Sequence, residues 1–402
     1  MGFLSRMFGR KTTSLDLWTE VYGGGRKTTA GVNVTTNKAL ETATVLACVR
    51  VIANGVAQVS WPLYLQEGDK KVKAKDHPLY NLLNVAPNPR QTAFDFRRTM
   101  AIHLCLTGNA YVWQGRVGRA KELRRMELLN PSQVAVRRTP EGVMTYKYQP
   151  PNAPGVDFSE EEIWHVRNLS WDGWMGLDGV KLARESIGLS MSTQDAHASM
   201  YANGSVMSGL LSMESKIDSE RYKFLESYLD KFMPGGDRAG KPLVLDMGAR
   251  FTPMTMTGVD AQHLETRKHQ IEEVCRAFGV LPIMIGYSDK TATYASAEQM
   301  FIAHVVHTMT PWYSLLEQSA DLFLLSEQER ASGYYTKFNV NAMMRGAAKD
   351  RGDFYSKALG AGGHGTAYMT PNDVRALEDM DPIEGGDTLP VGAQAGATNG
   401  AA

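Results

Sequence analysis

Residues 181–203, KLARESIGLSMSTQDAHASMYAN, form the stretch that decides the fold. They contain no proline, and Asn203-Gly204 can supply the left-handed conformation of a helix C-cap. We therefore predict a helix of about 35 Å, at about 1.5 Å per residue. Its thin apolar stripe consists of Leu182, Leu189, Ala196 and Met200. Such a helix buries little apolar area alone, so we expect it to pack among other helices, of this chain or of other subunits.

A second long helix is predicted for residues 260–278, ending at Gly279. Its apolar face carries Leu264, Ile271, Val274 and Phe278. The segment between the two long helices predicts a compact insert. In it, a short helix should follow Asp218 as N-cap, and strands are expected at 242–246 and 250–254.

A polar segment, YSDKTATY (287–294), precedes a third long helix. This helix is predicted to begin at the capping pair Ser296 and Gln299 and to continue to about Leu325. Pro311 lies in its interior and removes one backbone hydrogen bond there. We therefore expect the helix to kink at Pro311.

The N-terminal part of the chain combines helices and strands, which indicates an α+β fold. A helix is predicted from Ala39 to about Ser60, because apolar residues recur at three- and four-residue steps. These residues are Val45, Val49, Ile52 and Val56. A second helix is predicted from Thr92 to Leu106, with Gly108 as its stop. The period then changes to two, which predicts strands at 111–114, 123–128, 133–138, 144–148 and 163–167.

Charge excludes some classes of protein. The 402 residues contain 43 Lys plus Arg and 43 Asp plus Glu, so bulk charge cannot hold the chain on nucleic acid or an anionic membrane. Residues 97–138 are a local exception, with nine Lys or Arg against two Asp or Glu, a net charge of +7. The solvated face of a sheet is our favoured interpretation. A nucleic-acid-binding protein that uses this stretch for DNA or an acidic partner is the alternative.

Chemical motifs are weak. GGDRAGK (235–241) has the spacing of a phosphate-binding loop, but Pro242 stands where a magnesium-binding Ser or Thr is needed. His304 and His307 lack the intervening Glu of zinc hydrolases. Three widely separated cysteines indicate reduced thiols of an intracellular protein, and no targeting or membrane-spanning segment is apparent from the sequence. We expect no catalytic residue, metal or cofactor. A metal- or nucleotide-dependent hydrolase is the disfavoured alternative.

Seven short stretches, in this order, resemble the portal proteins of tailed double-stranded-DNA bacteriophages, in the form common among long-tailed phages. They are ACVRVIA (47–53), HPLYNLLN (77–84), PNP (87–89), TGNAY (107–111), DAQ (260–262), FGVLP (278–282) and AEQ (297–299). The resemblance implies a homo-oligomeric ring of about 12 subunits at one capsid vertex, which serves DNA packaging, DNA ejection and head–tail attachment. It also implies a virion protein assembled in the host cytoplasm.

The resemblance further implies a domain map and partners. The map is a flexible N-terminal arm (1–38), an α+β wing (39–180), a first stem helix (181–203), a small α/β clip (204–258), a second stem helix (259–280), a tunnel loop (281–295), a kinked helix returning to the wing (296–334), a short helical crown (335–386) and a disordered tail (387–402). Double-stranded DNA passes through the channel. The implied protein partners are terminase, the major capsid or scaffold protein, and head-completion or adaptor proteins.

Candidate site residues follow from that map. DNA-facing residues of the tunnel loop are expected to be Tyr287, Ser288, Asp289, Lys290, Thr291, Thr293 and Tyr294. Partner-binding residues of the clip are expected to be Asp218, Glu220, Arg221, Lys223 and Glu226. Residues 181–280 carry 12 basic and 13 acidic side chains, and a channel without net positive charge would let a duplex slide. Lys290 would then be a contact that forms and breaks as DNA passes.

Overall fold

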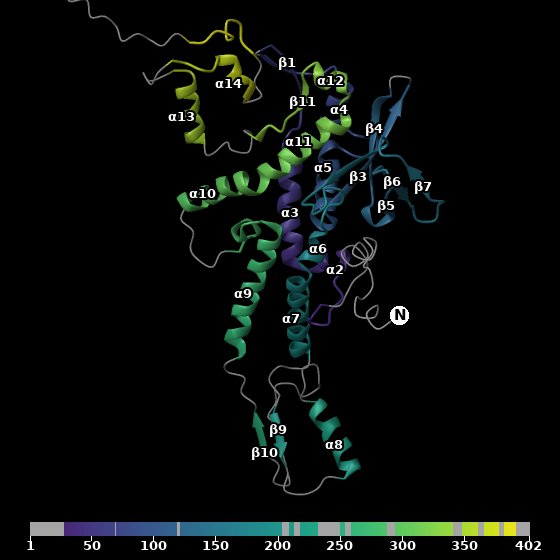
Figure 1. Cartoon of the computed structure of the whole chain (residues 1–402). Helices are drawn as coiled ribbons and strands as arrows, with labels where there is room; N and C mark the ends of the chain where they lie inside the picture. The colour runs from purple at the N-terminus through teal and green to yellow at the C-terminus, as the bar shows by residue number, and fades with distance from the viewer. Residues whose placement is uncertain are drawn as a thin grey trace, which may run out of the picture.

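The computed structural model describes residues 28–68, 70–118, 121–202, 209–212, 218–231, 250–253, 259–287, 294–340, 348–360, 366–377 and 382–390. Helices and small antiparallel sheets gather toward one end, and two long helices project from them toward a hairpin and a further helix (Figure 1). The fold is therefore α+β, as the sequence predicted. None of the helices in these ranges has an apolar run long enough to cross a membrane.

Helices α3 (Ala43–Gln58) and α5 (Ala93–Thr107) pack against each other and form the centre of the first part of the chain. The predicted stripe of α3 is buried, at Val45, Val49, Ile52 and Val56. The Thr92 side chain accepts a hydrogen bond from the Asp95 N–H and caps α5. Gly108, with φ 72°, ends it in the left-handed conformation. Two short helices flank this pair, α2 (Thr36–Glu41) and α4 (Pro78–Asn84).

Two three-stranded antiparallel sheets follow α5, and they contain all five strands predicted from the period-two pattern. The first has the order β4-β3-β8 and packs on α5. Its strands are β3 (Asn109–Val117), β4 (Glu122–Leu129) and β8 (Ile163–Arg167). The second has the order β5-β6-β7. Its strands are β5 (Val134–Arg138), β6 (Met144–Tyr148) and β7 (Val156–Phe158).

A third sheet pairs segments that lie far apart in the sequence. Its central strand β1 (Leu63–Glu67) pairs with β2 (Lys70–Lys73) and with β11 (Tyr334–Thr336), in the order β11-β1-β2. Leu63 lies opposite Thr336. No prediction covered this sheet, because its decisive pairing links segments far apart in sequence.

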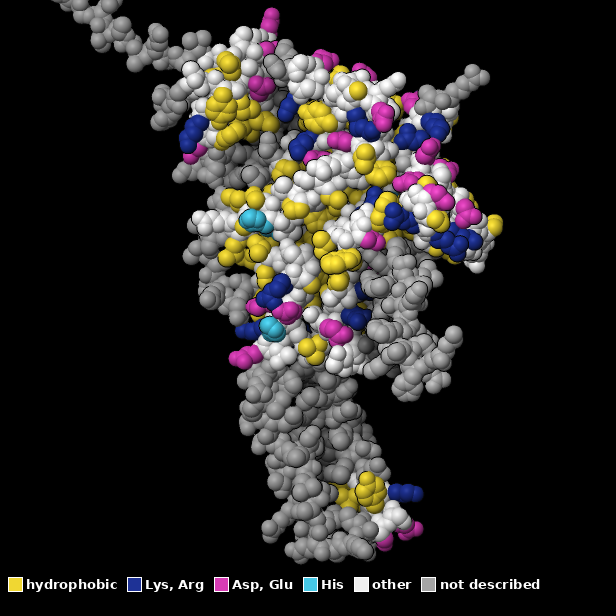
Figure 2. Space-filling model, in the orientation of Figure 1, with side chains coloured by type: hydrophobic (Ala, Val, Ile, Leu, Met, Phe, Trp, Pro, Cys, Tyr) yellow, Lys and Arg dark blue, Asp and Glu magenta, His cyan; other side chains and the backbone are white. Residues whose placement is uncertain are grey.

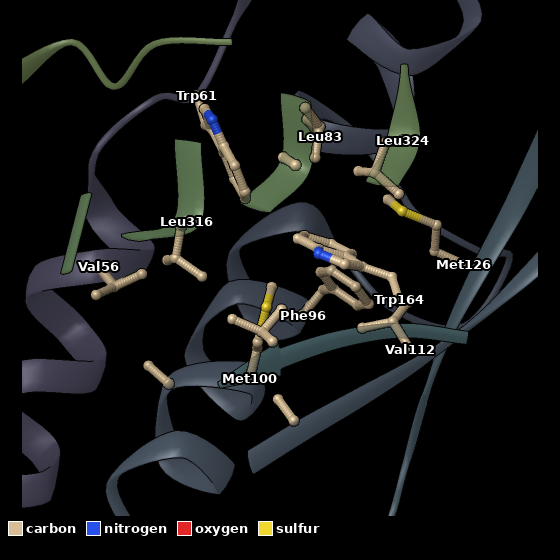
Figure 3. Close-up of a cluster of buried hydrophobic side chains, with 14 of the residues drawn as sticks. Val56, Trp61, Leu83, Phe96, Met100, Val112, Met126, Trp164, Leu316 and Leu324 are labelled. Atoms are coloured by element: carbon tan, nitrogen blue, oxygen red, sulfur yellow. The ribbon is translucent and has the colours of Figure 1, made fainter. Parts of the chain in front are cut away.

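The main core lies beneath these elements. It contains side chains from both of these distant parts of the chain. Figure 3 shows Trp61, Phe96, Met100 and Trp164 pointing toward one another. Phe338 stacks on Trp61, with ring centroids 4.6 Å apart and 16° between the ring planes. The Trp164 indole donates a hydrogen bond to the Ser319 hydroxyl at 2.8 Å.

The first long helix starts differently from the prediction. A one-turn helix, α6 (Gly179–Leu182), precedes α7 (Arg184–Ala202), so the single helix expected over 181–203 is interrupted at Ala183. Asp178 causes the extra turn, because its side chain accepts a hydrogen bond from the Lys181 N–H at 2.9 Å. The second long helix, α9 (Val259–Phe278), matches its prediction.

The third long helix consists of α10 (Tyr294–His304), a π-helical turn (Val305–Met309) and α11 (Thr310–Leu324). It begins at Tyr294, so the predicted capping pair Ser296–Gln299 is wrong. The π-helical turn lies immediately before Pro311, the position where a proline disturbs helical hydrogen bonding. The kink expected at Pro311 itself stays a prediction.

Six further elements complete the described part of the chain. Strand β10 (Arg250–Pro253), in the region predicted, pairs with β9 (Gly209–Ser212), which was not predicted. The strand expected at 242–246 lies outside the described residues. The remaining helices are α8 (Ser219–Asp230), α12 (Glu327–Ala331), α13 (Ala348–Ala358) and α14 (Pro371–Leu377).

Candidate functional site

The two long helices α7 and α9 lie side by side (Figure 1). Gln270 of α9 is 4% exposed and donates a hydrogen bond to the Thr193 hydroxyl of α7 at 3.2 Å. Ile187 is buried in one cluster with Val274 and Cys275 of α9. Leu182 and Leu189 of the predicted stripe, by contrast, are 64% and 47% exposed, so this part of the stripe is not covered within the described chain.

The C-terminal half of α9 is held more firmly, because it packs on α3. Val274 and Cys275 are fully buried in a cluster that includes Cys48 of α3. The Cys48 and Cys275 sulfur atoms are 3.8 Å apart and both thiols are free. Their hydrogen bond, together with burial, raises the pKa of the Cys48 thiol. This cluster joins the long-helix pair to α3.

The chain leaves α9 through a tightly bonded turn. Gly279, at φ 65°, follows the last helical residue, and the Val280 N–H bonds the Cys275 carbonyl at 2.9 Å. A 3₁₀ turn (Pro282–Ile285) comes next, and the Tyr287 N–H bonds the Pro282 carbonyl at 3.1 Å. Backbone hydrogen bonds therefore hold the chain in place as far as Tyr287, the first of the predicted DNA-facing residues.

The third long helix is tied to the same turn. The Thr308 hydroxyl of the π-helical turn donates a hydrogen bond to the Gly279 carbonyl at 2.7 Å. Of the predicted loop residues, Tyr287 is half-buried and Tyr294 is the first residue of α10. The others, Ser288, Asp289, Lys290, Thr291 and Thr293, lie outside the described residues.

α9 carries four acidic and three basic residues, a net charge of −1. They are Asp260, Glu265, Glu272, Glu273, Arg267, Lys268 and Arg276. The Arg276 guanidinium pairs with Glu273 on the same helix. This helix therefore has no net positive charge.

The predicted clip residues lie around the start of α8. The Asp218 carbonyl accepts a hydrogen bond from the Tyr222 N–H at 3.0 Å, and the side chains of Asp218, Glu220 and Lys223 are exposed. The side chains of Arg221 and Glu226 lie outside the described residues. Phe224, which the sequence did not single out, is 70% exposed beside them.

The basic stretch 97–138 does not form one free cationic face in the described residues. Arg97 is buried and donates hydrogen bonds to the carbonyl oxygens of Ala57 (2.8 Å) and Leu83 (2.6 Å), and burial lowers its pKa to about 10. Others of the stretch have acidic partners: the pairs are Arg98–Asp95, Lys121–Glu161, Arg124–Glu122 and Arg125–Glu127. Asp95 and Glu161 lie outside the stretch and were not counted in its net charge, so they reduce the positive charge on which the DNA-binding alternative depends.

The histidine pair and the phosphate-binding-loop pattern do not form a chemical site in the described residues. His304 is 3% exposed, burial lowers its pKa, and His307 is exposed on the π-helical turn. Residues 235–241 fall outside the described ranges. Within those ranges, no three or more His, Cys, Asp or Glu side chains form a group that could hold a metal ion.

Comparison with known proteins agrees with this geometry. The sequence profile of the family described as "Phage portal protein" matches residues 43–379. The portal protein of Enterobacteria phage HK97 is 28% identical over 360 residues, which cover 88% of this chain and 82% of that protein. The probable portal protein of Streptomyces phage phiC31 is 26% identical over 410 residues, which cover 96% and 87% of the two chains.

Solved structures share the fold. A chain from the neck of an empty GTA particle, computed with C6 symmetry, superposes with a TM-score of 0.59 at 21% identity, over 90% of this chain and 98% of that chain. An HK97-family phage portal protein from Corynebacterium diphtheriae gives a TM-score of 0.57 at 16% identity, over 80% and 98%. A chain from the neck of the native GTA particle, computed with C12 symmetry, gives 0.58 at 20% identity, over 91% and 99%.

Proposed function

Because the chain belongs to the phage portal protein family, we propose that its copies assemble into a closed ring at one vertex of a virus head, with a channel for DNA along its axis. About a dozen subunits would form the ring, through head-to-tail contacts that close by rotation. The role is structural and requires no reaction by the chain itself. The ring would serve packaging, ejection and tail attachment.

The exposed leucines at the start of the long-helix pair are the observation that carries the proposal. Leu182 and Leu189 are 64% and 47% exposed, although Ile187 between them is buried. Helices of low intrinsic stability depend on packing for their stability. Copies of the same pair arranged around an axis would bury these leucines and support every helix on both sides.

The absence of net positive charge on α9 fits a conduit for DNA. A ring in which each subunit contacted one phosphate would make about a dozen contacts, and its affinity would be high and steeply salt-dependent. Such binding would hold the duplex in place. A channel wall without net positive charge would let it slide, with Lys290 in the loop as the transient contact.

The division of the chain into domains is part of this proposal. We assign the wing to 39–180, the stem helices to 181–203 and 259–280, the clip to 204–258, and the tunnel loop to 281–295. The arm (1–38), the kinked helix (296–334), the crown (335–386) and the tail (387–402) complete the map.

The partners also belong to the proposal. The clip, with exposed Asp218, Glu220 and Lys223, projects farthest from the wing (Figure 1) and would meet terminase and later the head-completion or adaptor proteins. The major capsid or scaffold protein would surround the ring. Assembly would take place in the host cytoplasm, and the mature location would be the virion.

Electron-microscope images of the purified protein test the proposal directly. We expect particles with rotational symmetry and a central hole, sedimenting as a species roughly ten times the mass of one chain. A small species that binds DNA tightly and in a salt-sensitive manner would support the nucleic-acid-binding alternative instead. A monomer under every condition of salt, concentration and temperature would refute the ring.

A further inference from the structure

The loop that joins β8 to α6 exposes two large apolar side chains. Trp171 is 90% exposed and Leu169 is 69% exposed, whereas Trp164 and Trp61 are fully buried. Tryptophan carries the largest apolar surface of any side chain, so its nearly complete exposure is costly unless a partner covers it. We call residues 168–176 the Trp171 knob.

The knob is held in a fixed conformation by hydrogen bonds of its own polar residues. One carboxylate oxygen of Asp172 accepts from the N–H groups of Trp174 (2.8 Å) and Met175 (3.0 Å). The Ser170 hydroxyl accepts from the Gly173 N–H at 3.0 Å. A loop fixed in advance loses little conformational entropy when it binds, which favours affinity.

A buried asparagine attaches the knob to the sheet. Asn109, 5% exposed at the start of β3, donates from its amide to the Gly176 carbonyl (3.0 Å) and accepts from the Gly176 N–H (2.8 Å). Gly176 is so close to Gly108 that a Cβ atom there would lie 1.8 Å from the Gly108 carbonyl oxygen. The knob is therefore part of the rigid wing.

Two arginines border the knob. The Arg138 guanidinium lies 3.6 Å from the centroid of the Trp174 ring, and Arg167 donates to the Gly173 carbonyl at 2.8 Å. Neither arginine makes an ion pair with a carboxylate of the described chain. Tryptophan and arginine are the residues most enriched in interface hot spots, and unpaired guanidinium groups favour an acidic partner.

The knob packs on the sheets, where Met175 is buried in one cluster with Tyr111 and Tyr146. α3 contacts α9, α5 contacts α3, and the β4-β3-β8 sheet packs on the other side of α5 (Figure 1). If α9 faces the channel, as the proposed function requires, the sheet and the knob face away from it. The outward side of a ring meets other proteins rather than a neighbouring copy.

We propose that the Trp171 knob is a docking site, on which a different protein of the virus particle seats an apolar pocket bordered by carboxylates. This inference rests on the proposed ring, because the ring defines which side faces outward. Trp171 and Leu169 would fill the pocket, while Arg138 and Arg167 would face its acidic rim.

A second exposed apolar patch lies on α10, where Figure 2 shows hydrophobic side chains gathered at the surface. Among the described residues, no contact shows what would cover this patch, so it carries no proposal.

Photo-cross-linking in assembled particles tests this docking site. A benzophenone-bearing phenylalanine analogue replaces Trp171 in one set of particles and Val117, which is 63% exposed at the end of β3, in a matched set. After irradiation we expect position 171 to yield a cross-link to a different particle protein, at a segment rich in Asp or Glu, and position 117 to yield none to that segment. A cross-link from 171 to any copy of this chain, or no cross-link, overturns the proposal.

A substitution gives a second, independent readout. Trp171→Ala should leave ring formation intact and lower the fraction of heads that carry a ring at least about tenfold, the scale of a single hot-spot residue. Val117→Ala should change neither. Loss of rings in the Trp171→Ala chain would place the knob between copies and refute the docking site, and an unchanged fraction of ring-bearing heads would refute it too. If the parent chain forms no ring, the proposed function itself fails.

Discussion

Thr308 and Gly279, which belong to different long helices, are joined by a hydrogen bond of 2.7 Å from the Thr308 hydroxyl to the Gly279 carbonyl. Gly279 ends α9, and Thr308 lies in the π-helical turn before Pro311. The bond ties the end of α9 to the third long helix.

Thr308→Val removes this bond at nearly constant side-chain volume. We expect the free energy of unfolding to fall by about 1 kcal/mol, because one partly buried hydrogen bond is lost. Urea denaturation followed by tryptophan fluorescence measures the change, and Thr308→Ser, which keeps the hydroxyl, is the control. Equal stability of the Val and Ser variants would show that the bond contributes nothing.

Gly108→Ala should be strongly destabilising, because two costs combine there. Residue 108 has φ 72°, and an added Cβ would lie 2.1 Å from the Leu177 carbonyl oxygen. Left-handed backbone costs an alanine about 1–2 kcal/mol, and the clash adds about 1–3 kcal/mol. Gly118 has a similar φ of 78° with no described atom within 4 Å of such a Cβ, so Gly118→Ala isolates the backbone cost. Equal losses of unfolding free energy would contradict the close approach.

Stability should fall with acidification because of His165. Burial, aided by Arg167, lowers its pKa to about 3, and the neutral ring bonds Asn109 at 3.0 Å. The unfolded chain takes up this proton below about pH 6.5 and the folded chain does not. Full stability is therefore present above about pH 6.5, and about 1.4 kcal/mol per pH unit is lost between there and about pH 3.

The measurement for His165 is denaturation at a series of pH values, compared with a His165→Gln chain. The difference between the two curves isolates the contribution of this histidine, since His103, whose pKa burial lowers to about 4, remains in both. Parallel curves for the two chains would mean that His165 is protonated as readily in the folded state as in the unfolded state.

Lys290→Ala should weaken the transient contact with DNA. Each loop that touches a phosphate contributes about 0.9 to the log–log salt dependence of binding, so DNA retention in filled heads should respond less steeply to salt. Lys147→Ala, an exposed lysine on β6, is the control. Unchanged retention and packaging, after Lys290→Ala or after deletion within 288–294, would remove the role proposed for the loop.

Local patterns in the sequence predicted the elements whose causes are local. The stripe of α3 and the caps of α5 at Thr92 and Gly108 depend on neighbours within a few residues, and the structure confirms them. The extra turn α6 also has a local cause, the capping side chain of Asp178, which could have been recognised.

Pairings over long distances could not be predicted in this way. Strand β11 has three residues and no pattern of its own, and it exists because it pairs with β1. The exposure of Trp171 is a similar case. The residues around each tryptophan do not indicate that Trp171 is exposed while Trp61 and Trp164 are buried. For the candidate site, the tunnel loop stays a prediction of the resemblance, whereas the hydrogen bond from Thr308 to Gly279 required the structure.

The stacking of Phe338 on Trp61 has a consequence for synthesis of the chain. The core receives its last aromatic side chain only after residues 62–337 have been translated, because they lie between the two residues. A polypeptide that terminates before Phe338 therefore lacks the side chain that covers Trp61.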